Sequence, residues 1–306
     1  MTSKLRRPLA YLAGYLVCWA AAVGYLAASG GEWMTPILVF GVFGVVLSAI
    51  AWSLTRRSDP PAVRVARPRL EAWAVIAFLA IYAIGFLGYG MGAVREAIPA
   101  GPAQEVAVLA LKLVAHVAAP AILLVALGAQ LRPLFDSGLN RKGFWPVLTV
   151  LGLLLLALLS VVSPSLKEIG ALHPTLATLA WAAPATFVWL ALEAGLTEEF
   201  LFRAVLQTRL AAALRSETGA IVLGALVFAL AHVPGLFLRG EPGVDGYSTD
   251  IFQVIAFTVG TLSPIAVMFG VIWARTRSLL LVVLLHATVD VLPNMAEFIT
   301  TWSSGV

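Results

Sequence analysis

The sequence predicts an all-α, polytopic helical membrane protein with about eight to nine transmembrane helices and a cytoplasmic N-terminus. Of its 306 residues, 60% are hydrophobic and 12% are charged, whereas a soluble globular domain carries about 25% charged residues. The apolar residues form repeated runs of about 20, the length that crosses a hydrocarbon core of about 30 Å. The short alternating segments of a transmembrane barrel are not seen in the sequence. A soluble protein is therefore excluded.

Nine apolar segments follow one another, and most are separated by glycine, proline or serine turns such as Asp59-Pro60-Pro61. The basic residues before the first segment resemble the start of a signal peptide, but the run that follows is too long for one, so we expect an uncleaved first span. The expected bounds of the nine spans are 9–28, 35–54, 72–92, 105–127, 145–163, 178–203, 219–238, 251–274 and 278–293.

The basic residues determine the expected orientation, because Lys and Arg are retained on the cytoplasmic side of a membrane. Lys112 and Arg203 lie within spans. With the N-terminus inside, the other side holds only Arg95, Lys167 and Arg239. The cytoplasmic segments then hold 15 basic residues: Lys4, Arg6, Arg7, Arg56, Arg57, Arg64, Arg67, Arg69, Arg132, Arg141, Lys142, Arg209, Arg215, Arg275 and Arg277.

This placement also accounts for the net charge of +4 without nucleic acid as a partner. We expect an integral multi-pass protein of the cell membrane (inner or plasma membrane), with the lipid bilayer as a partner. The single cysteine, Cys18, excludes disulfides within the chain and cysteine metal clusters. His-Glu-x-x-His, Gly-x-Ser-x-Gly and nucleotide-binding fingerprints do not occur in the sequence.

Charged and histidine side chains inside the spans need a reason, because a charge near the bilayer centre costs about 2.5–3.5 kcal/mol on insertion scales. For Lys112, His116 and Glu193 we expect structural roles: snorkelling, a helix–helix hydrogen bond, and the lining of a shared cavity. The other six are the candidate catalytic residues: Glu198, Glu199, Arg203, His232, His286 and Asp290.

Glu198 and Glu199 are adjacent, and Arg203 follows four residues after Glu199. Residues four apart are neighbours on a helix, so Arg203 is predicted to pair with Glu199. Glu198 then stays free beside a fixed ion pair, as expected of a general base with an orienting partner.

The remaining three candidates lie on two later spans. His286 and Asp290 are four residues apart and share a helix face, while His232 follows Phe228 by one turn. Counted from the cytoplasmic ends at about 1.5 Å per residue, all these groups lie about 13–20 Å deep. This common depth predicts one site that faces the cytoplasm.

Glu198-Glu199-x-x-x-Arg203, Phe228-x-x-x-His232 and His286-x-x-x-Asp290, in this order, resemble the three motifs of the CPBP family of intramembrane proteases. That family includes relatives of the type II CAAX prenyl endopeptidases and bacteriocin-processing or abortive-infection-type membrane proteases. The resemblance covers roughly residues 180–295. We therefore expect a protease core at 145–306 and accessory transmembrane helices at 1–144.

The resemblance implies a peptide or protein substrate as a further partner, with hydrolysis of its peptide bond within the membrane at a cavity open to the cytoplasm. Glu198 and His232 would bind and polarise the attacking water, with Glu199 and Arg203 supporting Glu198. His286 and the last-motif residue would stabilise the oxyanion. The prenyl endopeptidases resemble this pattern with Asn in that last position, whereas this chain has Asp290.

An ionised Asp290 cannot donate a hydrogen bond to an oxyanion, so it must be protonated, orient His286 or bind a metal. No cofactor is certain from the sequence. If a metal is used, Glu198, His232, His286 and Asp290 are the plausible ligands for zinc.

Two other classes of protein stay open. A proton- or ion-coupled transporter also places Glu, His and Asp at mid-membrane, although the paired half-repeats of transporters are not seen. The third alternative is a non-catalytic membrane scaffold that retains the motifs.

Overall fold

Nine helices long and apolar enough to cross a membrane make up most of the computed structural model, which describes residues 3–303. Within these described residues no strand occurs, so the predicted all-helical membrane fold is confirmed. The chain is an integral multi-pass membrane protein. Five spans are continuous helices: α1 (Ser3–Ala28), α8 (Phe144–Val162), α12 (Glu217–Arg239), α13 (Ile251–Thr276) and α14 (Leu279–Ser303).

The other four spans contain wider, π-helical stretches, labelled η. The short helix α9 (Ser165–Ala171) and the 3₁₀ turn η4 (Arg132–Leu134) lie in connections. The second span consists of α2 (Met34–Val39), η1 (Phe40–Leu47) and α3 (Ser48–Leu54), and the third of α4 (Pro68–Tyr82), η2 (Ala83–Gly90) and α5 (Met91–Ala97). The fourth span consists of α6 (Pro102–Leu113), η3 (Val114–Ala118) and α7 (Ala119–Ala126). The sixth span consists of α10 (Leu176–Leu190), η5 (Ala191–Leu196), η6 (Glu199–Gln207) and α11 (Thr208–Leu214).

Side-chain caps explain where three of the spans begin. The Thr175 hydroxyl accepts from the Thr178 N–H at 3.0 Å ahead of α10. Ser216 and Asp250 cap α12 and α13 in the same way. Each cap satisfies one of the backbone N–H groups that the first helical turn leaves without a partner.

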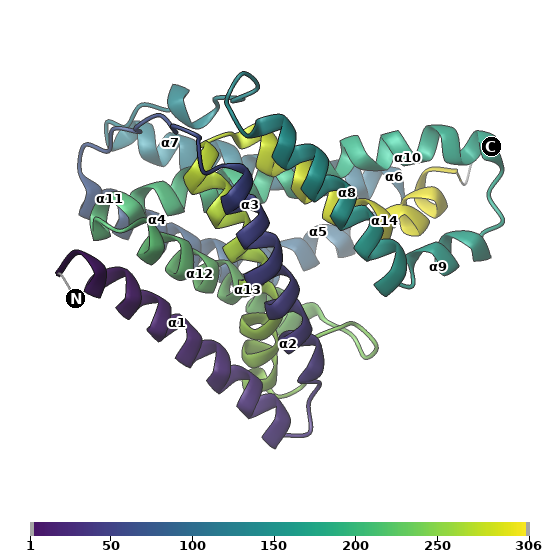
Figure 1. The fold of residues 1–306 in the computed structure, drawn as a ribbon. Helices are drawn as coiled ribbons and strands as arrows, with labels where there is room; N and C mark the ends of the chain where they lie inside the picture. Colours follow the sequence, from purple (N-terminus) through teal and green to yellow (C-terminus); the bar gives the residue numbers. More distant parts are fainter. Residues whose placement is uncertain (1–2, 304–306) are drawn as a thin grey trace.

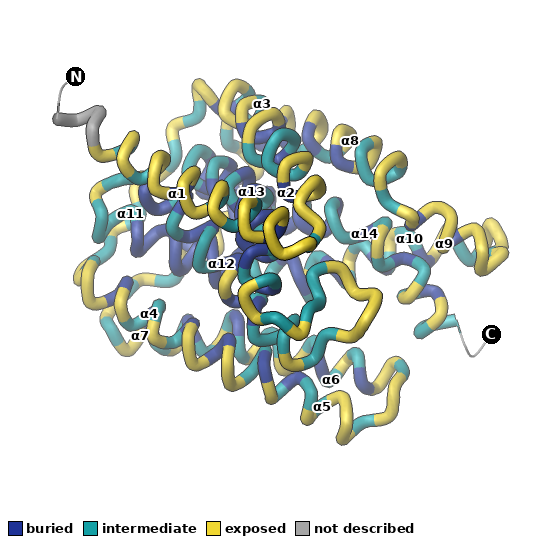
Figure 2. The backbone as a smooth tube through the Cα atoms, turned by 90° about the horizontal axis from the view of Figure 1, so that it is seen from below, coloured by how far each residue is buried: buried dark blue, intermediate teal, exposed yellow. Residues whose placement is uncertain are grey.

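The last three spans form the centre of the molecule. Figure 2 shows buried residues gathered on α12 and α13, while α1, α3 and α8 expose most of their outer faces. In the most apolar stretch of α13, 67% of the residues are buried inside the protein. Large apolar side chains such as Ile81 and Val161 are exposed on the periphery, as expected for surfaces that face lipid.

The connections between spans gather on two opposite faces (Figure 1). The first span begins towards one of them and the last span ends towards the other. We define the basic face by the loops at 55–67, 127–143, 215–216 and 277–278. We define the opposite face by the loops at 29–33, 98–101, 163–175 and 240–250.

Hydrogen bonds hold the loops of each face together. On the basic face, Arg275 donates to the Thr55 carbonyl at 2.7 Å. On the opposite face, the Tyr25 hydroxyl donates to Asp250 at 2.7 Å. The nine spans therefore alternate in direction, as the sequence predicts.

The sixth span is longer than expected, since it continues from Leu176 to Leu214 rather than ending near residue 203. Arg209, which the sequence analysis counts among the cytoplasmic segments, consequently lies inside this helix. It is fully buried, and its Nε is 3.4 Å from the Glu71 carboxylate. The buried partner in α4 draws Arg209 into the protein, and spacing along the chain does not reveal that partner.

Candidate active site

The two adjacent glutamates lie in the sixth span, at the junction between η5 and η6. Glu199 is fully buried, and its Oε2 is 3.2 Å from Arg203 Nε. The predicted pairing of Glu199 with Arg203 is thus present in the structure. The Arg203 guanidinium also lies over the ring of Phe228, 4.8 Å from its centroid, which adds a cation–π contact.

Glu198 makes no such pair and lies among the histidines. Its Oε1 is 3.9 Å from His232 Nε2, and its Oε2 is 3.8 Å from His286 Nε2. Both separations are too long for direct hydrogen bonds. They suit a small polar molecule that contacts the carboxylate and an imidazole together.

His232 is oriented by its own helix. Its Nδ1 is 2.8 Å from the Phe228 carbonyl oxygen. A carbonyl only accepts, so Nδ1 carries the proton in this bond, and the lone pair of the neutral ring is on Nε2. The Nε2 atom is the one that faces Glu198. Phe228 therefore contributes to the site through its carbonyl group as well as through its ring.

His286 is held between carboxylates from two helices. Its Nδ1 is 2.8 Å from Glu199 Oε1, across from α14 to the sixth span. Its Nε2 is 3.3 Å from Asp290 Oδ2, one turn along α14. Both ring nitrogens thus face acceptors, an arrangement that suits N–H donors.

The structure therefore brings together all six predicted residues. The resemblance implies that Glu199 and Arg203 support Glu198, which was expected to stay free beside their ion pair. In the structure, Glu199 contacts Arg203 and His286. The reason is tertiary: α14 packs against the sixth span and places an imidazole opposite the Glu199 carboxylate, 87 residues away in sequence.

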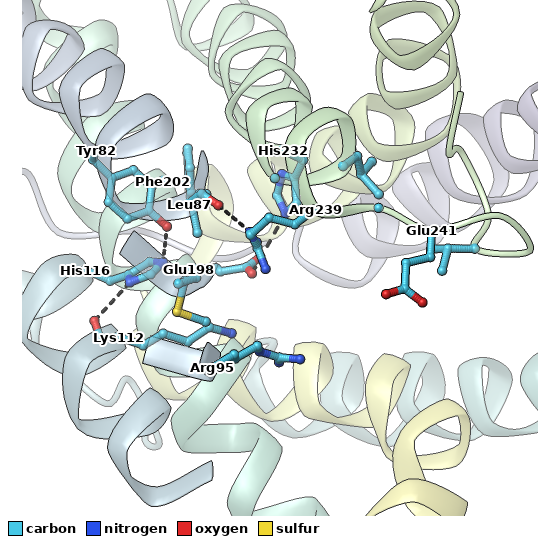
Figure 3. A pocket seen from close by; sticks show the side chains of 15 residues that line it. Tyr82, Leu87, Arg95, Lys112, His116, Glu198, Phe202, His232, Arg239 and Glu241 are labelled. Atoms are coloured by element: carbon cyan, nitrogen blue, oxygen red, sulfur yellow. Dashed lines mark hydrogen bonds and ion pairs between the residues drawn. The ribbon is translucent and has the colours of Figure 1, made fainter. Parts of the chain in front are cut away.

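A cavity of about 530 Å³ reaches Glu198 and His232. In Figure 3, Glu198 lies between a wall that carries Tyr82 and His116 and a wall that carries His232 and Arg239. The remaining charged lining residues are Arg95, Lys112 and Glu241. Much of the lining of this cavity thus comes from the third and fourth spans, which were expected to be accessory helices.

His116 and its partner form a fixed part of this wall. Its Nδ1 is 2.9 Å from the Lys112 carbonyl, so Nδ1 carries the proton and Nε2 accepts from the Tyr82 hydroxyl. This agrees with the helix–helix hydrogen bond expected of His116. The sequence holds no signal for Tyr82, because an aromatic residue in an apolar span is ordinary.

Lys112 and Glu193 form an ion pair between the fourth and sixth spans. Lys112 lines the cavity that reaches Glu198, whereas Glu193 lines a smaller neighbouring cavity of about 130 Å³. Lys112 was expected to snorkel and Glu193 to line the cavity of the site. In the structure, the two side chains pair with each other instead.

The direction of the cavity is the main difference from expectation. From Glu198 it extends along α12, past Gly235 and Arg239, to Glu241 and Val244 in the loop at 240–250. That loop belongs to the opposite face. The basic residues predict that the opposite face lies outside the cytoplasm. A cavity that opens on this face therefore disagrees with the expected cytoplasmic opening.

The geometry of the donor side chains does not fit a zinc site. Within residues 3–303, no three His, Cys, Asp or Glu side chains are grouped as ligands of one metal ion. Both nitrogens of His286 face carboxylates instead. We therefore derive no step through a metal.

Fold and site together define a polytopic membrane protein with a glutamate–histidine site between its helices. Residues 179–292 match the family model described as "Type II CAAX prenyl endopeptidase Rce1-like". This segment is thus similar to Rce1-like domains, which confirms the resemblance seen in the motifs and supports a CAAX-type membrane protease. The matched segment is just over a third of the chain and includes all six candidate residues. No curated protein matches the chain, and no solved structure matches it.

Proposed function

We propose that this protein is an intramembrane endopeptidase that hydrolyses a peptide bond of a membrane-associated, lipidated or peptide substrate with a water activated by Glu198. One observation carries the proposal. Glu198 and His232 are the two acid–base groups of the motifs that line the large cavity, and their facing atoms are 3.9 Å apart. A substrate carbonyl in the cavity can reach a water held between them.

The chemistry follows from the hydrogen-bonding capacity of each group. The water donates one proton towards His232 Nε2 and transfers the other to the Glu198 carboxylate as its oxygen bonds to the scissile carbonyl carbon. The carbonyl oxygen takes the displaced electron pair, and an N–H of His286 stabilises this oxyanion. The C–N bond then breaks, and the proton on Glu198 passes to the leaving amine.

The other motif residues position this chemistry. Glu199, neutralised by Arg203, accepts from His286 Nδ1 and so directs Nε2 towards Glu198. Asp290 accepts from Nε2 in the resting site. Of the three roles open to Asp290, its geometry favours the orientation of His286.

We further propose that the cavity opens on the non-cytoplasmic side of the cell membrane. The cavity ends at Glu241 and Val244 in the loop at 240–250. Basic residues concentrate on the other face, which the positive-inside rule assigns to the cytoplasm. Substrates would then present their scissile bond from the outer side, after export or as parts of other membrane proteins.

The test is cleavage of a peptide library by the purified full chain in detergent, with no ion gradient present. We expect turnover by the wild type and a loss of about 10²- to 10⁴-fold in Glu198→Gln, the range of general-base contributions. Glu297→Gln is the matched control: it makes the same chemical change at an exposed position of α14. Near-normal turnover of Glu198→Gln would end the proposed mechanism, and a wild type that cleaves nothing would favour the scaffold or transporter alternatives.

A further inference from the structure

A separate cavity, of about 200 Å³, lies on the basic face, and none of the six candidate catalytic residues lines it. It lies between the loop after α3, the loop before α8 and the end of α13. Asp59 is its only acidic lining residue. Its basic lining residues are Arg57, Arg141, Lys142 and Arg275.

Two of these cations are fixed by the protein backbone. Arg141 Nη1 donates to the Thr276 carbonyl at 2.5 Å, and Arg275 Nη2 donates to the Thr55 carbonyl at 2.7 Å. The two loops also touch directly, because the Ser58 hydroxyl donates to the Lys142 carbonyl at 2.5 Å. These bonds tie the loops to α13 and build the walls of the cavity.

A glycine makes this close approach possible. Gly143 has φ +99°, and a Cβ at this position would lie 2.9 Å from Ser58 Oγ. Only glycine adopts this backbone conformation readily and leaves room for the neighbouring loop. The cavity is thus part of the folded structure.

Arg141 is paired with Asp136, but the other cations of the cavity are poorly balanced by the protein. Within residues 3–303, Arg57 and Lys142 have no acidic partner within ion-pair distance, and both are exposed. The buried Nε atom of Arg275 has no hydrogen-bond partner in the same described range. An anion in the cavity would balance the charges of Arg57 and Lys142.

The cavity also has exposed aromatic residues near it in sequence. Trp52 in α3 and Trp145 at the start of α8 are each 59% exposed, and both flank the cavity in sequence. The helices that carry them are in contact. Exposed tryptophans at the ends of spans favour the level of the lipid headgroups.

We propose that this cavity binds the phosphate of an anionic phospholipid headgroup. Guanidinium groups match phosphate oxygens in geometry and charge. Basic pockets on the cytoplasmic side of membrane proteins meet a leaflet rich in anionic lipids, and here the two tryptophans accompany the start of the acyl chains. The inference does not depend on the proposed protease function.

The test titrates a short-chain phosphatidylglycerol into the purified full chain in detergent and follows the thermal unfolding temperature. Phosphatidylcholine of the same chain length and inorganic phosphate are titrated in parallel. We expect phosphatidylglycerol alone to raise the unfolding temperature at low concentration. In the double variant Arg57→Gln/Lys142→Gln, the half-saturating concentration of phosphatidylglycerol should rise by about 25-fold, because each basic residue contributes about fivefold.

Arg64→Gln/Arg69→Gln is the matched control, because it removes two charges from the same face outside the cavity. It should keep the wild-type response. An equal loss in this control would show general surface attraction and overturn the site. An equal response to inorganic phosphate or to phosphatidylcholine would overturn the lipid assignment. The two targeted side chains are exposed, so unfolding temperatures without lipid should stay at the wild-type value.

Discussion

Glu198 and Glu199 are neighbours with different environments. The Glu199 side chain is fully buried, beside Arg203 and His286, whereas Glu198 is 18% exposed and lines the cavity. One carboxylate is therefore held by an ion pair and a hydrogen bond, and the other is available to a reacting water. A pair of identical side chains acquires two roles from environment alone.

Removal of the Arg203 guanidinium should show that this residue has a structural role, which Glu198 does not share. Arg203→Ala leaves the Glu199 carboxylate buried without its cation, and breaking a buried pair costs about 3–5 kcal/mol. We expect a loss of this size in the free energy of unfolding, measured by denaturant titration in detergent, together with lost cleavage. The double variant Glu199→Gln/Arg203→Ala should recover part of the stability, because no unpaired charge remains. A wild-type stability for Arg203→Ala would contradict the buried pair.

Asp290 offers a second test, because its 3.3 Å contact with His286 Nε2 needs only an acceptor oxygen. Asp290→Asn retains such an oxygen and adds an amide donor, so cleavage should stay within about tenfold of wild type and be insensitive to chelators. Asp290→Ala removes the contact and should lower turnover by about 10- to 100-fold, as for other orienting partners. Bound zinc that is lost together with activity in Asp290→Asn would instead identify a metal ligand.

Helix packing depends on a buried ion pair that joins the third and sixth spans. Arg209 in α11 faces Glu71 in α4, and it also donates from Nη1 to the Ala204 carbonyl at 3.2 Å. Glu71 in turn accepts from the Arg67 backbone N–H at 2.9 Å. The pair thus connects the start of one span with the end of another near the basic face.

Arg209→Ala should therefore destabilise the protein without any direct effect on the site. We expect the free energy of unfolding to fall by about 3–5 kcal/mol, while the folded fraction retains its turnover per molecule. Arg215→Ala, at an exposed position just after α11, serves as the control and should change the unfolding free energy by less than about 0.5 kcal/mol. Equal stability of both variants would show that the pair adds nothing.

The orientation of the whole molecule is tested by labelling. In a Cys18→Ser background, Ser137→Cys reports the basic face and Glu241→Cys reports the mouth of the large cavity; both positions are exposed. A membrane-impermeant maleimide added to intact cells should label residue 241 and leave residue 137 unlabelled until the membrane is opened.

Labelling of residue 137 but not of residue 241 in intact cells would show that the cavity opens to the cytoplasm. The orientation predicted from the basic residues would then be wrong. Labelling of both positions from one side would contradict the alternation of the spans. Labelling of one position alone thus decides whether the large cavity or the basic face lies on the cytoplasmic side.

The sequence by itself determined the all-helical membrane fold and most span bounds. Hydrophobic runs of membrane length and charged turns are local properties of the chain, so they can be read without knowing how the helices pack. The pairing of Glu199 with Arg203 was predictable for the same reason, since four-residue spacing places both on one helix face.

Only the tertiary structure decided what these groups meet on other helices. The contact of His286 with Glu199, the Tyr82 and His116 wall, and the burial of Arg209 all depend on which spans are neighbours. The opening of the cavity depends on the same packing. Hydrophobic patterns specify that a helix face is buried, but contacts between helices are set by side-chain packing and hydrogen bonds across the bundle.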